Sequence, residues 1–316
     1  MKISTVLVLA MTVWFCADAR AVLVYNGTAS NLSAPVLNDP GWEAVASIYL
    51  GSPGNGPGTA SFLGNQGGYA WFLTANHVTL GGATLSIGNS TYSVFSGIQQ
   101  IGSVDLKVFR LDTTVSGITP VTLASSVPAV NASVTMIGYG KNGTKTTWDI
   151  PGGNTTWTSP GADASGYDWS GSNVKRWGKN TVAAHNVVSG SGNLIVTDFS
   201  PLVDEAQGSV GDSGGAVFHK NGLQWELSAV MIAVGRLEGG TLYIDGFAGQ
   251  PGSTSVYSIS GSPNDRSVTY SVQIADYKNL ILEAIPEPAP VTLLLGLAIL
   301  ALRKRRGADN LVSCNI

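Results

Sequence analysis

The stretch GSVGDSGGAVF, residues 208–218, sets Asp212 and Ser213 side by side within a run of glycines. A serine hydroxyl is a poor nucleophile until a nearby base takes its proton. That base is usually an imidazole, itself oriented by a carboxylate. If the glycines expose Ser213 as a nucleophile, the rest of the chain must supply a histidine and an acid.

Of the three histidines in the sequence, His77 is the best candidate for the base. It lies at the end of YAWFLTANHV, residues 69–78, whose alternation predicts a buried strand that holds the ring rigidly. His185 has no acid within several residues of it. His219 follows Ser213 on or near the same strand, a span of about 20 Å, which is too long for a hydrogen bond.

The acid should come from another strand, and GSVDLKVFRL, residues 102–111, offers one. Asp105 stands at the start of an apolar alternation, which suits a side chain held at a strand end. Asp112 stands past the same strand among threonines, where solvent is favoured. We expect Asp105 to be the partner of His77 and keep Asp112 as the competitor.

Two other interpretations of the glycine-rich stretch fit less well. Residues 211–215 satisfy GxSxG, the nucleophile turn of α/β-hydrolases, but that fold needs its acid and histidine after the serine. Only His219 follows, and alternating helices are missing. A phosphate cradle would require GxxxxGK[ST] and a following helix, and the stretch has neither.

The central region, from Val22 to about Ala284, shows no helical period sustained over three turns. Short alternating or apolar runs recur between turns rich in Gly, Asn and Pro, a pattern typical of an all-β barrel or sandwich. Lys-Asn-Gly-Leu at 220–223 predicts a hairpin, because Asn-Gly accepts the positive φ of a primed turn. The segment 272–285 has the apolar spacing of one short amphipathic helix.

Composition excludes several classes of function. Charged residues make up 12% of the chain and the formal net charge is −3, so a nucleic-acid partner is not expected. The two cysteines, Cys16 and Cys314, lie in the terminal segments, which leaves the centre without a disulfide or a thiolate cluster. The histidines form no metal-binding spacing, so neither a metal nor another cofactor is expected.

Four stretches resemble motifs of the trypsin-like (chymotrypsin-fold) serine proteases. They are LTANHV (73–78), VDLKVFRL (104–111), TMIGYG (135–140) and VGDSGGAVF (210–218). The order His77, Asp105, Ser213 is also that family's order. The resemblance implies two six-stranded antiparallel β-barrels, the first over about 22–120 and the second over about 121–275, within a protease domain spanning 22–284. The long interval between Asp105 and Ser213 implies extra structure, expected within 141–185.

The same resemblance assigns roles to the site residues. His77 would act as general base and then general acid, and Asp105 would fix its tautomer. The backbone N–H groups of Gly211 and Ser213 would form an oxyanion hole. Gln207 would lie at the floor of the primary specificity pocket, where a neutral amide favours an uncharged substrate residue.

Asp212 is linked by the resemblance to activation, through binding the ammonium of a newly cut N-terminus. The chain lacks an obvious Ile-Val-Gly-Gly start after an activation arginine. Removal of a leader would itself expose Val22, or a later cut would be needed. Both routes stay open.

The first 21 residues, MKISTVLVLAMTVWFCADARA, have the layout of a secretory signal peptide with cleavage after Ala19 or Ala21. The alternative is an N-terminal anchor helix, which the short apolar run disfavours.

The C-terminal segment 285–316 resembles a PEP-CTERM sorting signal of bacterial exported proteins. Pro286-Glu287-Pro288 is followed by an apolar run at 291–302 and a basic cluster at 303–306. The resemblance implies transient membrane insertion through 291–302 and cleavage by an exosortase-type enzyme. Ten residues follow Arg306 (316 − 306), where such signals usually end.

Together these features predict an exported serine endopeptidase that acts on a protein or peptide substrate through an acyl-enzyme intermediate. Its expected location is the cell envelope, the cell surface or the extracellular space. The alternative is a binding or structural protein at the cell surface that keeps the protease scaffold without turnover.

Overall fold

A computed structural model of the chain describes residues 22–35, 39–51, 58–93, 95–152, 156–247 and 250–286. The predicted signal peptide and nearly all of the predicted sorting segment lie outside these residues. In the described part, regular structure is almost entirely β, with two short 3-10 helices, η1 (Ala29–Leu32) and η2 (Trp42–Ala44), and one α-helix, α1 (Lys278–Glu283). No helix in these ranges is long and apolar enough to cross a membrane.

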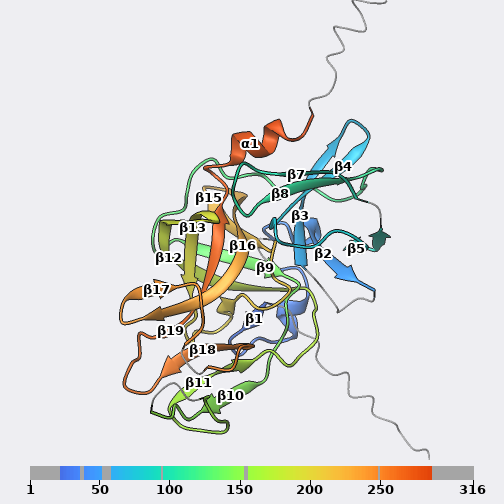
Figure 1. The fold of residues 1–316 in the computed structure, drawn as a ribbon. Helices are drawn as coiled ribbons and strands as arrows, with labels where there is room; N and C mark the ends of the chain where they lie inside the picture. Colours follow the sequence, from blue (N-terminus) through green and yellow to red (C-terminus); the bar gives the residue numbers. More distant parts are fainter. Residues whose placement is uncertain are drawn as a thin grey trace, which may run out of the picture.

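The first half of the chain forms one antiparallel sheet of seven strands in the order β6-β5-β2-β3-β4-β8-β7 (Figure 1). Its strands are β2 (Val45–Leu50), β3 (Gly58–Gln66), β4 (Tyr69–Thr74), β5 (Ala83–Ile87), β6 (Ser90–Tyr92), β7 (Ser96–Gln100) and β8 (Lys107–Leu111). Aromatic side chains from three central strands fill its interior. The ring of Phe72 stacks on that of Phe109 with 5.4 Å between centroids and lies 5.3 Å from that of Phe62.

The second half forms another antiparallel sheet of seven strands, in the order β15-β9-β12-β13-β19-β16-β17. Pairing of β15 with β16 closes six of them into a ring, and β17 extends from β16. The strands are β9 (Ser133–Gly138), β12 (Arg176–Ser189), β13 (Gly192–Asp198), β15 (Ala216–Asn221), β16 (Gln224–Glu238), β17 (Thr241–Tyr243) and β19 (Arg266–Gln273).

Two smaller sheets complete the strand pairing. β1 (Leu23–Val24) pairs with β14 (Ala206–Gln207). β10 (Lys145–Trp148), β11 (Ala164–Asp168) and β18 (Thr254–Ile259) form a three-stranded sheet, seen at the bottom of Figure 1. Sequence reasoning expected extra structure near here, but not a separate sheet that recruits β18 from much later in the chain.

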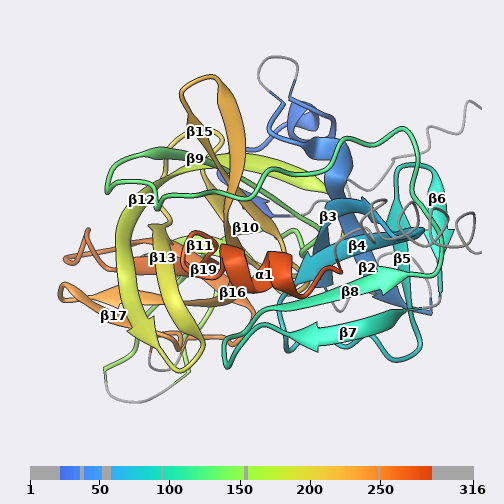
Figure 2. The ribbon, with the colours of Figure 1, turned by 90° about the horizontal axis from the view of Figure 1, so that it is seen from above.

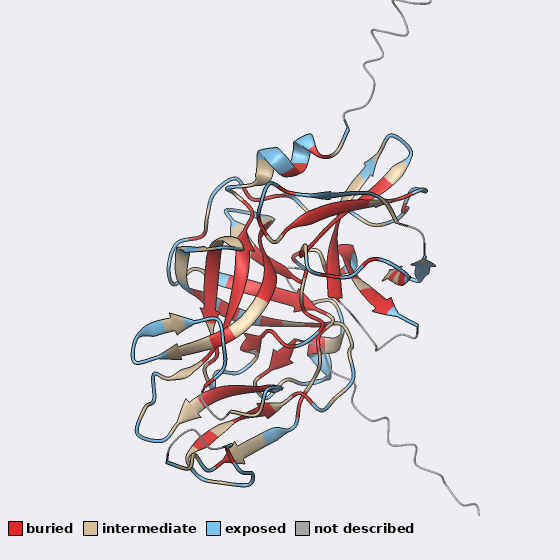
Figure 3. Cartoon of the chain, viewed as in Figure 1, coloured by how far each residue is buried: buried red, intermediate tan, exposed pale blue. Residues whose placement is uncertain are grey.

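The two large sheets lie side by side and bury a common core. The largest cluster of buried apolar residues includes side chains from both, such as Val45 and Phe72 from the first and Ile137 and Val230 from the second. Figure 3 shows the buried residues along the strands of both sheets, with exposed residues at hairpin ends. In Figure 2, α1 lies above the junction, where the Lys278 ammonium donates to the carbonyl of Leu123 at 3.0 Å.

The structure confirms the all-β class and the single short C-terminal helix. The predicted hairpin at 220–223 is present between β15 and β16, but its two turn residues are Gly222 and Leu223, because Asn221 pairs with Gln224. Of the predicted Asn-Gly pair, only Gly222 has a positive φ, +62°. The strand count differs from the prediction of six per barrel: the second sheet closes through six strands and adds β17. The first has seven, and among the described residues no pairing between β6 and β7 closes it.

Candidate active site

The three predicted catalytic residues meet at the junction of the two large sheets. His77 follows β4 and Asp105 precedes β8, and these two strands pair with Leu73 opposite Val108. Ser213 lies in the loop between β14 and β15, on the side of the second sheet. The first sheet therefore supplies an imidazole and a carboxylate, and the second supplies a hydroxyl.

The imidazole bridges the other two side chains. His77 Nδ1 lies 2.7 Å from Asp105 Oδ2, and His77 Nε2 lies 2.8 Å from Ser213 Oγ. The backbone N–H of His77 donates to Asp105 Oδ1 at 3.0 Å. With the carboxylate accepting from Nδ1–H, Nε2 is left as the acceptor for the serine hydroxyl, the arrangement that a general base requires.

The environment keeps Asp105 ionised. Burial by itself would raise the pKa of this carboxyl, but hydrogen bonds from the ring and backbone N–H of His77, and from the backbone N–H of Asn76, lower it below 3.8. The side chain of Asp105 is 18% exposed, against 47% for that of His77. The carboxylate is thus shielded behind a ring that faces solvent.

The competing residues lie elsewhere. Asp112 is half-exposed and accepts a hydrogen bond from Ser96 Oγ at 2.6 Å. The Nδ1 of His219 lies 3.0 Å from the carbonyl of Ser133, and His185 is on β12 with no partner for its Nδ1 among the described residues. In the same ranges, no three His, Cys, Asp or Glu side chains come together as a metal site.

The loop that carries Ser213 presents free backbone donors. Within the described chain, neither the Gly211 nor the Ser213 N–H donates to a protein acceptor. Gly211 has φ +98° and Gly214 has φ +86°, values that disfavour other residues. A Cβ at position 214 would lie 1.9 Å from the carbonyl oxygen of Thr59, so close approach of β3 also requires glycine there.

Thr59 on β3 ties this loop to the first sheet. Its N–H donates to the carbonyl of Ser213 at 2.8 Å, and its hydroxyl donates to the carbonyl of Gly211 at 3.0 Å. The same hydroxyl accepts from the N–H of Tyr139 at 3.1 Å. Sequence reasoning missed Thr59, because its role depends on strand β3 reaching across the junction.

Asp212 is buried beneath the loop. Its carboxylate accepts from the N–H of Gly140 at 2.7 Å, from the N–H of Ser209 at 2.9 Å and from the Ser209 hydroxyl at 3.0 Å. The backbone N–H of Val22, itself fully buried, also donates to it. Burial raises the pKa of Asp212 to about 7, since these hydrogen bonds offset only part of the desolvation.

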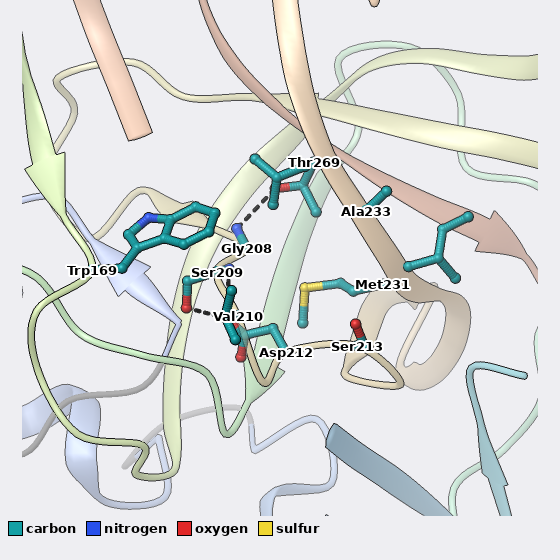
Figure 4. A pocket seen from close by; sticks show the side chains of 11 residues that line it. Trp169, Gly208, Ser209, Val210, Asp212, Ser213, Met231, Ala233 and Thr269 are labelled. Carbon is teal, nitrogen blue, oxygen red and sulfur yellow. Dashed lines mark hydrogen bonds between the residues drawn. The ribbon is translucent and has the colours of Figure 1, made fainter. Parts of the chain in front are cut away.

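A cavity of about 230 Å³ opens beside Ser213. Figure 4 shows Trp169 and Ser213 toward its opposite ends, with Thr269 and Met231 along the sides. The remaining lining residues are Gly208, Ser209, Val210, Asp212, Ile232, Ala233 and Val234. Gln207, predicted as the pocket floor, is not among them: it is fully buried in β14, opposite Leu23 of β1.

A second cavity of about 200 Å³ lies next to the first. Trp169 and Val234 line both cavities. Trp169 follows β11 and its indole N–H donates to Ser255 Oγ on β18 at 3.1 Å, so the three-stranded sheet holds it in place. The indole thereby forms part of the wall between the two spaces.

No family model and no curated protein matches the chain. Solved structures do match. One is neuropsin, "a serine protease expressed in the limbic system of mouse brain", which is 15% identical. The match covers 78% of this chain and 96% of that chain, with a TM-score of 0.47. At this identity and TM-score, the match assigns no role to His77, Asp105 or Ser213, and only the geometry of the site bears on what they do.

Proposed function

We propose that the protein is a serine endopeptidase with His77, Asp105 and Ser213 as its catalytic residues. The observation that carries this proposal is the imidazole that bridges a carboxylate at 2.7 Å and a hydroxyl at 2.8 Å. Two unpartnered backbone N–H groups lie on the same loop as the hydroxyl. A nucleophile, its base, an orienting acid and candidate oxyanion donors are thus present together.

The steps follow from this geometry. Ser213 Oγ attacks the substrate carbonyl carbon while its proton passes to His77 Nε2. The N–H groups of Gly211 and Ser213 stabilise the negative oxygen of the tetrahedral intermediate. His77 then gives the proton to the leaving amine, and an ester remains on Ser213. A water molecule, deprotonated by His77, attacks the ester and releases the acid with Ser213 restored.

The cavity beside Ser213 favours an uncharged substrate residue. Its walls are apolar side chains, backbone and hydroxyl groups, and its one carboxylate, on Asp212, already accepts hydrogen bonds from Gly140, Ser209 and Val22. A cationic substrate group would find no free counter-charge there. Gln207 does not line this cavity, and its expected place at the floor of the specificity pocket stays a prediction.

We also propose that cleavage after Ala21 makes Val22 the N-terminus of the mature protein. Its backbone N–H already contacts the buried carboxylate of Asp212. A cut after Ala21 would turn that amide into an ammonium and give the carboxylate a cationic partner without a large movement. Export through residues 1–21, sorting through 285–316 by an exosortase-type enzyme, and a location in the envelope, on the surface or outside the cell remain part of the proposal, supported by sequence alone.

A fluorophosphonate probe tests the proposal directly. The protein beginning at Val22 should form a covalent adduct on Ser213 and hydrolyse peptides from a library, and Ser213→Ala should abolish both. Ser96→Ala is the matched control, because its hydroxyl donates to Asp112 at the surface and Ser96 does not line the cavity beside Ser213. A folded protein that forms no adduct would favour the scaffold-only alternative.

A further inference from the structure

Lys107 is a buried lysine directly behind the candidate triad. It is the first residue of β8 and pairs with Thr74 at the end of β4, so it lies under the turn that carries His77. Only 7% of its surface is exposed. Its ammonium donates to the carbonyl oxygen of Asn76 at 2.9 Å and to that of Val78. These carbonyls belong to the residues on either side of His77.

Asp105 and Lys107 hydrogen-bond the backbone of the same turn and carry opposite charges. The Asp105 carboxylate accepts the backbone N–H groups of Asn76 and His77, and the Lys107 ammonium takes the carbonyls of Asn76 and Val78. Asp105 lies in the bend before β8 and Lys107 is the first residue of that strand, so both lie beside the turn that follows β4, the strand paired with β8. The backbone around the imidazole is therefore fixed by charged hydrogen bonds, which are stronger than neutral ones.

We propose that Lys107 is a positioning residue for His77: its ammonium fixes the turn that holds the imidazole between Asp105 and Ser213. This inference rests on the proposed function. The sequence LTANHV offers no other short-range support for the turn, apart from the bond between the Val78 N–H and the Ala75 carbonyl at 3.2 Å.

The charge of Lys107 matters because its partners are carbonyl oxygens. Burial lowers the pKa of Lys107 from 10.5, while the charge of Asp105 favours the ammonium. An uncharged side chain of the same length would leave the carbonyls of Asn76 and Val78 without this donor. The turn would then lose part of the support that holds the imidazole between Asp105 and Ser213.

The test is Lys107→Met in the protein that begins at Val22, and two measurements are made. In a Ser213→Ala background, the NMR signal of the His77 Nδ1 proton, which is donated to Asp105, should be broadened and shifted relative to the parent. In the active protein, kcat should fall by about ten- to a hundred-fold with little change in KM, because a misplacement on the order of 1 Å can cost that much. A merely structural role would lower thermal stability and leave the Nδ1 proton signal and kcat unchanged.

A chemical rescue separates charge from shape. Lys107→Cys, alkylated while unfolded and then refolded, carries either an S-aminoethyl group, which restores the ammonium, or an S-propyl group of the same length without charge. The parent is treated in parallel, because Cys314 reacts too. Only the aminoethyl form should restore the parent Nδ1 proton signal and kcat. Equal rescue by both groups, or an unchanged Nδ1 proton signal in folded Lys107→Met, overturns the inference. An inactive parent contradicts the proposed function instead, while the NMR measurement still tests the role of Lys107.

Discussion

At the scale of single residues, the site depends on which carboxylate faces the imidazole. Asp105 lies 2.7 Å from Nδ1 of His77, whereas Asp112 bonds Ser96 at the surface. We expect Asp105→Asn to lower kcat by about 10⁴-fold, because an amide in that position favours the wrong imidazole tautomer. Asp112→Asn should change kcat by less than about twofold, as a surface substitution should. Steady-state hydrolysis of one peptide measures kcat for both variants. Equal losses of kcat would contradict the assignment of Asp105 as the partner of His77.

The second residue-scale prediction concerns Asp212 and pH. Its pKa is raised to about 7 by burial, so between pH 3.8 and about 7 the folded, uncut chain holds a proton that the unfolded chain has lost. The free energy of unfolding therefore falls as pH rises through this window. In a chain beginning at Val22, the new ammonium pairs with the carboxylate, and this fall should disappear. Urea unfolding of both forms at pH 4 to 7 measures the difference.

Two matched forms control this comparison. A chain beginning at Ala21 keeps an amide at Val22 and should retain the fall. Glu205→Gln removes a different carboxyl whose pKa burial also raises to about 7, and it should flatten the profile equally in cut and uncut chains. The proposal that Val22 is the mature N-terminus is contradicted if the free energy of unfolding has the same pH dependence in the chains beginning at Ala21 and at Val22.

At the scale of elements, the three-stranded sheet of β10, β11 and β18 shapes the cavity beside Ser213. It holds Trp169, which lines that cavity and its neighbour. Trp169→Ala should join the two cavities. The ratio of kcat/KM for a substrate with Phe at the cleaved position to kcat/KM for a substrate with Ala there should then rise by about tenfold. Trp148→Phe changes a buried ring of the same sheet that lines neither cavity, and should leave the ratio unchanged. An unchanged ratio in Trp169→Ala would show that Trp169 does not limit the size of the specificity pocket.

The elements also explain what the sequence could predict. The strands before His77 and after Asp105 have local apolar patterns, and Asn221-Gly222 marks its hairpin, so local physics is enough to find them. The three-stranded sheet could not be found this way, because Gly166 on β11 pairs with Val256 on β18, far along the chain. The contacts of Thr59 and Lys107 likewise depend on which strands become neighbours.

At the scale of the whole molecule, the segment before β2 is fastened to the second sheet by Lys175. This residue precedes β12, and its side-chain amino group donates to the carbonyl of Trp42 in η2. It also lies 4.5 Å from the ring centroid of Trp42 and 5.6 Å from that of Tyr139, which follows β9. On this side of the junction, a half-buried lysine from the second half of the chain therefore contacts one aromatic ring from each half.

Burial lowers the pKa of Lys175 to about 7, although the charges of Glu43 and Asp39 favour the ammonium. Between pH 7 and 10.5 the unfolded chain thus binds a proton that the folded chain does not, so the free energy of unfolding should rise with pH across this window. Lys175→Met should flatten that rise. Lys145→Met is the control, because the pKa of Lys145 is raised rather than lowered by the tyrosines around it, Tyr257 foremost. Urea unfolding from pH 7 to 10 measures both variants. If the parent and Lys175→Met keep parallel profiles, Lys175 stays protonated in the folded protein, and the junction is held by an ammonium instead of a neutral amine.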